Sequence, residues 1–217
     1  MQIVAISDTH ENFYSPESMP PGDVLIHAGD FTNIGSISAI RRFAVWLDTI
    51  SSKYNKILVI AGNHDVSFER NSREAKWTLH NYGPANLCYL QDGQFDFQDK
   101  KFYGSPWQPE FGCNWAFNLP RGEQLAQKWS KVPENTDILI THGPPFGILD
   151  PGRGEDNVGC KDLAIAVTEV IRPRLHIFGH CHSGTGRIRK NSTLYINAAA
   201  CDESHKLVNP PQIIQLP

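Results

Sequence analysis

Short apolar runs recur along this chain, and each ends abruptly at side chains that can bind a metal or carry a proton. Residues 57–60 (ILVI) are typical of a buried strand, and Asn63 and His64 follow almost at once. Comparable runs at 3–6, 24–26, 138–140 and 175–178 precede, in turn, Asp8 and His10, Asp30, His142, and His180 and His182. Because α/β folds bind ligands beyond the carboxyl ends of their strands, the pattern predicts one metal site assembled at that edge.

Helical periodicity fills most of the segments between these runs. Apolar residues spaced three or four apart predict helices over 37–50, 72–82, 122–131 and 162–172. Ser36 or Ser38 can cap the first of them. The alternation of strands and helices predicts an α/β fold in which two packed mixed β-sheets are flanked by helices. The length of 217 residues fits a single domain over 1–217.

The middle of the chain follows a different pattern. Short segments at 87–90, 94–97 and 101–103, separated by turn residues, predict antiparallel strands or hairpins. Residues 104–118 are aromatic and interrupted by proline, with no regular period, which is typical of an ordered loop. Strands near 192–198 and 212–216 are predicted to close the chain.

The composition and charge of the chain indicate which binding partners and which cellular location to expect. A hydrophobic content of 40% with 20% charged residues is typical of a globular protein. The net charge of -3 gives no general attraction for nucleic acid or anionic membranes, so neither an extended nucleic-acid surface nor a membrane contact is expected. The sequence shows no secretory pattern and no apolar stretch long enough to span a bilayer. Its five cysteines lack paired spacing, which predicts reduced thiols and a cytoplasmic location.

The polar strand ends offer the ligand types that a pair of metal ions requires. Two ions about 3.5–4 Å apart share a bridging carboxylate, with imidazoles and carboxylates in most other positions. The candidate ligands are Asp8, His10, Asp30, Asn63, His142, His180 and His182. In an extended strand, period-two spacing would direct both members of Asp8-x-His10, and of His180-x-His182, to one side. Asn63 adds an oxygen ligand without adding negative charge that would repel a phosphate.

Five motifs lie in a fixed order between residues 8 and 182: Asp8-x-His10, Gly29-Asp30, Gly62-Asn63-His64-Asp65, Thr141-His142-Gly143 and Gly179-His180-Cys181-His182. In order and spacing they resemble the calcineurin-like metallophosphoesterase superfamily. A narrower resemblance, to the brain-type metallophosphoesterase-domain-containing subfamily, covers nearly the whole chain. It rests on GSPW at 104–107, FNLPRG at 117–122, THGPP at 141–145, RPRLH at 172–176 and VNPP at 208–211.

The resemblance implies a four-layer sandwich fold and two divalent metal ions, for which the mixed nitrogen and oxygen ligands suit Mn, Fe or Zn. It assigns one ion to Asp8, His10, Asp30 and His182, and the other to Asp30, Asn63, His142 and His180. Asp30 would bridge the two ions. The resemblance further implies that a metal-bridging hydroxide attacks phosphorus while His64 protonates the leaving oxygen as general acid.

Two features of the motifs bear on the activity. Phosphoprotein phosphatases carry Asp and Arg shortly after the bridging Asp, where this chain has Asn33-Ile34-Gly35. Asn33 could still orient His64 through its amide oxygen, but no Arg is present there to grip a phosphate. Some subfamily members have Gly in place of His180, so His180 predicts a complete metal pair.

We therefore expect a phosphodiesterase for small phosphodiesters, with cyclic nucleotides expected from the subfamily. The alternatives are a phosphomonoesterase or nuclease of the same superfamily, or a non-catalytic metal-binding scaffold.

Several other side chains have a structural interpretation beside a functional one. Aromatic residues of the 104–118 loop could form a small core or stack on a nucleobase, and Trp107 is the predicted stacking contact. Structural roles are predicted for Asp65, bonded to loop backbone, for a buried Cys181, and for His27 and His176. Surface positions are predicted for His80, His205, Arg153 and Lys161.

Overall fold

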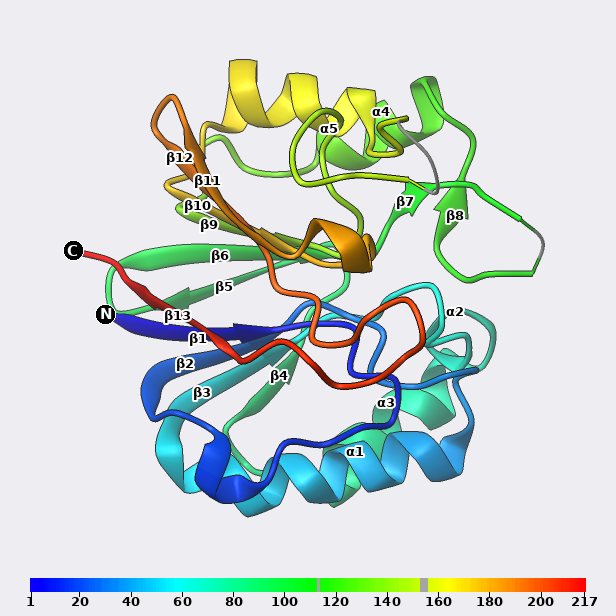
Figure 1. Cartoon of the computed structure of the whole chain (residues 1–217), viewed down its shortest axis with the longest axis vertical. Helices are drawn as coiled ribbons and strands as arrows, with labels where there is room; N and C mark the ends of the chain where they lie inside the picture. Colours follow the sequence, from blue (N-terminus) through cyan, green and yellow to red (C-terminus); the bar gives the residue numbers. More distant parts are fainter. Residues whose placement is uncertain (113, 153–155) are drawn as a thin grey trace.

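Two mixed sheets packed face to face form the centre of the computed structural model, which describes residues 1–112, 114–152 and 156–217 (Figure 1). The surface position predicted for Arg153 concerns a residue outside these ranges. Helices cover the outer face of each sheet, so the described part of the chain has four layers (Figure 1). The predicted fold class, with two packed mixed sheets flanked by helices, is confirmed.

The first sheet has the strand order β13-β1-β2-β3-β4. Its strands are β1 (Gln2–Ile6), β2 (Gly22–His27), β3 (Tyr54–Val59), β4 (Leu87–Tyr89) and β13 (Gln212–Gln215). Neighbours from β1 to β4 are parallel, and β13 adds antiparallel to β1.

The second sheet has the order β11-β12-β10-β9-β6-β5. Its strands are β5 (Gly93–Phe97), β6 (Lys100–Ser105), β9 (Ile138–Thr141), β10 (Leu175–Phe178), β11 (Gly186–Lys190) and β12 (Thr193–Asn197). The four central strands are parallel, and an antiparallel hairpin closes each edge. A small parallel pair, β7 (Gln108–Pro109) with β8 (Asn118–Leu119), lies in the aromatic loop.

The helices divide between the two outer faces (Figure 1). Below the first sheet lie α1 (Ile37–Ile50), α2 (Ser67–Arg70) and α3 (Ser72–Tyr82), and above the second lie α4 (Glu123–Trp129), α5 (Lys161–Ile165) and its π-helical continuation η3 (Ala166–Ile171). Short 3₁₀ turns occur at η1 (Pro16–Ser18), η2 (Ser51–Lys53) and η4 (His182–Gly184). The Ser36 hydroxyl caps α1, accepting a hydrogen bond from the Ala39 amide at 3.2 Å, as the sequence allowed. Among the described helices, none has the length and apolarity needed to cross a bilayer.

The central strands are apolar on both faces because each lies between two other layers. In β1, Val4 and Ile6 pack in the cluster that contains α1 and α3. Ile3 and Ala5 alternate with them and pack between the sheets, in the same cluster as Ile177 of β10. Fully burying an Ile or Val side chain contributes roughly 1.5–3 kcal/mol, so this middle layer holds the two sheets together.

One strand prediction was wrong, and one strand was not predicted. Residues 87–90 do not join an antiparallel hairpin, because β4 pairs in parallel with β3 after the α3 crossover and forms the edge of the first sheet. The antiparallel hairpin predicted next to it is present as β5 and β6. Strand β11 was missed because its residues are mostly exposed and basic, and it is held by pairing to β12 rather than by burial.

Candidate metal centre

The loops at the carboxyl ends of five strands bring the predicted metal ligands together. Asp8 and His10 follow β1, Asp30 follows β2, Asn63 follows β3, His142 follows β9, and His180 and His182 follow β10. Their ligand atoms form two groups, each within 4.8 Å: Asp8 with His10 and His182, and Asp30 with His142 and His180. Each group takes ligands from both sheets, so neither sheet alone can complete a metal site.

Distances between these atoms fit the edges of a coordination shell. Donors about 2.0–2.1 Å from a common cation lie about 2.9–3.4 Å from each other in octahedral or tetrahedral geometry. His142 Nε2 lies 2.9 Å from Asn63 Oδ1 and 3.2 Å from Asp30 Oδ2. In the other group, His182 Nε2 lies 3.3 Å from Asp8 Oδ1 and 3.2 Å from His10 Nε2. The donor set therefore fits two divalent cations.

Backbone carbonyls fix two of the imidazoles with one nitrogen free for a metal. His142 Nδ1 lies 2.9 Å from the Ala28 carbonyl, and His182 Nδ1 lies 2.8 Å from the Asp202 carbonyl. Because a carbonyl oxygen only accepts hydrogen bonds, Nδ1 must carry the proton in both rings. Once Nε2 gives up its own proton, its lone pair faces the site, the arrangement that metal-binding histidines require.

The two buried carboxylates are held by backbone amides as well as by histidines. The His180 amide donates to Asp8 Oδ2 at 2.9 Å, and the His64 amide donates to Asp30 Oδ1 at 2.8 Å. Burial acts to raise the pKa of both carboxyl groups, but the neighbouring histidines outweigh it and hold each pKa well below its usual range. Both groups are therefore ionised and available to cations at neutral pH.

The period-two argument for the two His-containing motifs was wrong in its geometry. Asp8, His10 and His180 have φ values of 52°, 45° and 67°, which belong to left-handed loop backbone rather than an extended strand. His180 and His182 point into different ligand groups instead of lying side by side. Left-handed backbone at non-glycine residues is costly, and a further predicted ligand, Asp30, adopts it with a φ of 57°.

Two glycines allow the backbone to approach the carboxylates closely. A Cβ on Gly62 would lie 2.2 Å from Asp30 Oδ1, and one on Gly179 would lie 1.9 Å from Asp8 Oδ2. Both positions exclude any side chain, because the carboxylates cannot move without leaving their donors.

Gly179→Ala is therefore expected to lower metal affinity by about 10- to 100-fold, since the methyl group displaces Asp8. Metal content of the purified variant, measured by elemental analysis after dialysis against limiting Mn²⁺, checks this. Gly93→Ala is the matched control, because a Cβ there would have no neighbour closer than 3.9 Å. Full metal occupancy in Gly179→Ala would contradict the assignment of Asp8 as a ligand.

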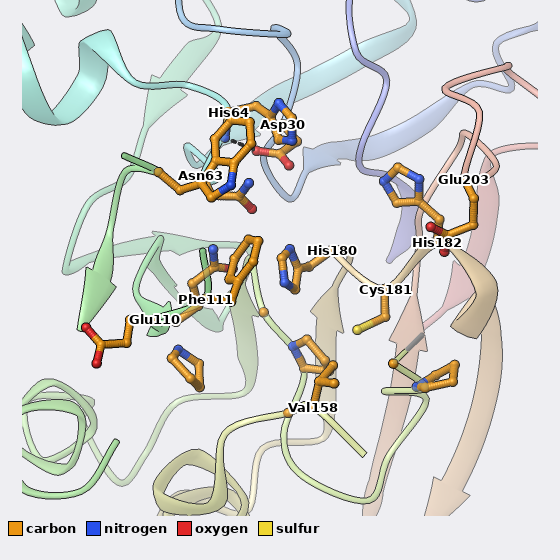
Figure 2. Close-up of a pocket in the computed structure, with 18 of the residues that line it drawn as sticks. Asp30, Asn63, His64, Glu110, Phe111, Val158, His180, Cys181, His182 and Glu203 are labelled. Carbon is orange, nitrogen blue, oxygen red and sulfur yellow. Dashed lines mark hydrogen bonds between the residues drawn. The ribbon is translucent and has the colours of Figure 1, made fainter. Parts of the chain in front are cut away.

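His64 lies beside the ligand groups and is oriented by backbone. Its Nδ1 is 2.6 Å from the Asn33 main-chain carbonyl, so Nδ1 carries the proton and Nε2 is left without a fixed partner. The predicted contact through the Asn33 amide oxygen was wrong, because the carbonyl of the same residue takes that place. The centre of the His64 ring lies 4.7 Å from the centre of the His10 ring. Figure 2 shows His64 next to Asp30 at the cavity wall.

Asp65 ties the loops after β2 and β3 together, as predicted. Its carboxylate accepts hydrogen bonds from the amides of Asp30 and Gly62 at 2.8 Å each, and from the amide and hydroxyl of Thr32. Burial and the adjacent charge of Asp30 raise the pKa of Asp65 to about 7. Asp65 therefore holds the backbone of Asp30 and is not among the residues that line the cavity.

The remaining structural predictions hold for the described residues. His27 and His176 are fully buried, and each bonds a threonine hydroxyl, of Thr9 at 3.0 Å and Thr141 at 2.9 Å. Cys181 is a buried free thiol, and His80 and Lys161 are exposed.

A cavity of about 680 Å³ opens in front of the two ligand groups. Asp30, Asn63 and His180 face it, with Phe111 beside His180 and Glu203 beside His182 (Figure 2). Glu110 and Arg121 also line it. The guanidinium of Arg121 donates to the carbonyls of residues 158 and 159 at 2.7 Å each. Both terminal nitrogens of Arg121 thus donate to the backbone of residues 158 and 159.

The structure places the predicted stacking residue away from this cavity. Trp107 donates to Asp92 Oδ2 at 2.8 Å, and the Lys128 ammonium lies 3.7 Å from its ring centre. The prediction of Trp107 as the stacking contact was therefore wrong, because its ring packs against Phe117 and against the hydrophobic clusters that the outer helices form with the first and the second sheet. Trp115 and Phe111 line the cavity in its place, with ring centres 4.1 Å from His64 and 4.9 Å from His180.

His205, predicted to be a surface residue, is part of the site. Its ring stacks on His10 with centres 3.9 Å apart and planes inclined by 3°. The residue is exposed, but the exposed face lines the cavity. The sequence carried a signal for it, since residues 194–200, which are apolar except for Asn197, are followed by Asp202, Glu203 and His205.

Comparisons with known proteins agree with this geometry. Residues 1–184 match the family described as calcineurin-like phosphoesterase. The chain is 42% identical to metallophosphoesterase domain-containing protein 1 of Homo sapiens, over all of this chain and 71% of that protein. It is 37% identical to a UPF0046 protein of Caenorhabditis elegans, over all of this chain and 76% of that protein.

The crystal structure of TT1561 of Thermus thermophilus shares the fold. It superposes with a TM-score of 0.63 over 98% of this chain and 97% of that one, at 13% identity. The relatives that match over the whole of this chain and the family match together establish the relationship. This chain belongs to the calcineurin-like phosphoesterase family.

Proposed function

We propose that this protein is a dinuclear metal-dependent phosphodiesterase that hydrolyses small phosphodiesters, with cyclic nucleotides as the substrate class. Membership of the family implies metal-dependent phosphoester hydrolysis. The choice of a diester rests on one observation, the charge of the cavity wall in front of the ligand groups.

The wall of the cavity favours a singly charged substrate. Among its described residues, Arg121 is the only arginine or lysine, and its guanidinium is already bonded to backbone carbonyls. Glu110 and Glu203 add negative charge to the same wall. A phosphomonoester carries about two charges near neutral pH and a diester carries one, so the diester meets less repulsion.

The chain's own residues would bind the cations and manage the proton. Asp8, His10, Asp30 and His182 would hold one cation, and Asp30, Asn63, His142 and His180 the other. When bound, the cations supply Lewis acidity that activates water and screens the phosphoryl charge. His64, held through Nδ1–H by the Asn33 carbonyl, presents Nε2 to the cavity, and as the imidazolium it would give its Nε2 proton to the departing oxygen.

The aromatic walls support a substrate that carries a nucleobase. Phe111 is 40% exposed, and Trp115 is partly exposed, and both line the cavity. Stacking of a nucleobase on such a ring contributes about 1–3 kcal/mol to binding and needs no base-specific hydrogen bonds.

Hydrolysis rates with matched substrates test the proposal. Bis-p-nitrophenyl phosphate and p-nitrophenyl phosphate release the same leaving group and differ in charge. We expect the Mn²⁺-loaded protein to show a kcat/KM roughly 10-fold or more higher for the diester, since each uncompensated charge costs more than about 1.4 kcal/mol. Turnover of 2′,3′- and 3′,5′-cyclic nucleotides, followed by chromatography, identifies the natural class.

Each alternative has its own outcome. A higher rate on the monoester would indicate a phosphomonoesterase, and degradation of DNA or RNA in preference to small diesters would indicate a nuclease. Binding of metal without hydrolysis of any diester would identify a scaffold and overturn the proposal.

A further inference from the structure

His205 places a third imidazole against the predicted metal-binding and acid residues. One nitrogen each from His10, His64 and His205 lie within 4.8 Å of one another. The His205 ring covers the His10 ring face to face and meets the His64 ring at 80°, with centres 5.7 Å apart. His205 thus lies on the cavity side of His10, beside the proposed acid His64.

The loop that carries His205 is built to hold this position. The Asp202 side chain accepts hydrogen bonds from the amides of Ser204 and Lys206 at 2.8 and 3.0 Å. The His205 carbonyl accepts a hydrogen bond from Asn12 at 3.1 Å, and the Asp202 carbonyl bonds the predicted ligand His182. The φ of His205 is 56°, a costly left-handed value for a residue other than glycine.

We infer that His205 is a substrate-binding residue that donates a hydrogen bond to a phosphoryl oxygen, together with His64. This inference rests on the proposed function in one respect, that the cavity holds a phosphoryl group. It assigns the loop after β12 a role in the site.

The distances allow one oxygen to contact both rings. An acceptor can lie about 2.8 Å from each of two nitrogens that are up to 4.8 Å apart, within ordinary hydrogen-bond geometry. The His205 imidazole has an N–H to donate even when neutral, whereas His64, whose Nδ1–H is held by the Asn33 carbonyl, donates from Nε2 as the imidazolium. His205 would thereby supply a donor that Arg121, bonded to its own loop, does not.

A pair of substitutions separates this role from simple support of His10. His205→Phe keeps a ring that can stack on His10 but removes the donor. His205→Gln removes the ring and keeps a neutral N–H donor at similar reach. The assay is calorimetric binding of inorganic phosphate to the full chain loaded with Mn²⁺, with metal content measured in parallel.

We expect His205→Phe to weaken phosphate binding about 10- to 100-fold, the usual effect of losing a hydrogen bond to a charged group. The phosphate affinity of His205→Gln should stay within about 3-fold of that of the unmodified protein, because the variant keeps a donor. His80→Phe, at an exposed histidine on α3, is the control for the substitution itself.

Several results would overturn the inference. They are unchanged phosphate binding in His205→Phe, weakening in His205→Gln as large as in His205→Phe, loss of metal from both variants, and absence of phosphate binding by the unmodified protein. If phosphate binding responds as expected but no diester is hydrolysed, the inference stands and the proposed function fails. The two proposals can therefore be judged separately.

Discussion

Asp30→Asn should abolish hydrolysis more completely than any other single change at the site. Asp30 is the carboxylate that we propose is shared by the two cations, and its oxygens lie 3.2 Å from His142 Nε2 and 2.8 Å from the amide of His64. An amide cannot bridge two cations as a carboxylate does. We expect kcat/KM on bis-p-nitrophenyl phosphate to fall about 10³-fold or more, because bound cations stabilise the transition state by several kcal/mol.

Metal analysis shows whether this loss has the expected cause. Asp30→Asn should bind fewer equivalents of Mn²⁺ than the unmodified chain, while Asp48→Asn, at an exposed position on α1, should retain the full number. Circular dichroism distinguishes loss of metal from loss of fold. Normal metal content with normal turnover would remove Asp30 from the bridging position and, with it, the dinuclear assignment.

His64→Ala is expected to produce a loss that depends on the leaving group. An alkoxide leaving from a cyclic nucleotide needs a proton, so its hydrolysis should slow about 10²- to 10⁴-fold. Nitrophenolate departs without protonation, so bis-p-nitrophenyl phosphate should be affected less than about 10-fold. The measurement is kcat for both substrates with the same Mn²⁺-loaded preparation.

His80→Ala provides the matched comparison, because His80 is exposed and lies on α3, outside the cavity lining. It should leave both rates unchanged. Equal losses of His64→Ala on both substrates would indicate that His64 shapes the site instead of protonating the leaving oxygen.

Much of the site could be predicted because a parallel sheet converts sequence order into spatial proximity. Asp30 and Asn63 each follow an apolar strand, and neighbouring parallel strands end at one edge. The ligands could be predicted from residue type and position after each strand, without knowing the backbone conformation of the loops. For this reason the ligands converge even though the argument from extended backbone was wrong. Left-handed residues such as Asp8 cannot be identified from residue type, because only glycine signals that backbone reliably.

The rest of the cavity depends on which face each loop side chain presents. Trp107 and Trp115 belong to the same aromatic loop, yet only Trp115 faces the cavity, because Asp92 and Lys128 hold Trp107 in a separate cluster. These partners lie 15 and 21 residues away in sequence from Trp107 and follow no period. Tertiary contacts of this kind set side-chain direction, and no local pattern encodes them.

The interleaving of ligands from both sheets has a consequence for biosynthesis. His10 and His182 face each other across 172 residues of sequence, and Asp30 likewise meets His142 and His180 from the later part of the chain. A growing polypeptide therefore has no complete cation cage until β10 and the loop behind it have emerged from the ribosome and docked. With the proposed ligands, loading of the cations must follow synthesis of the chain through His182, and a product that ends before β10 would lack a complete set of ligands for either cation.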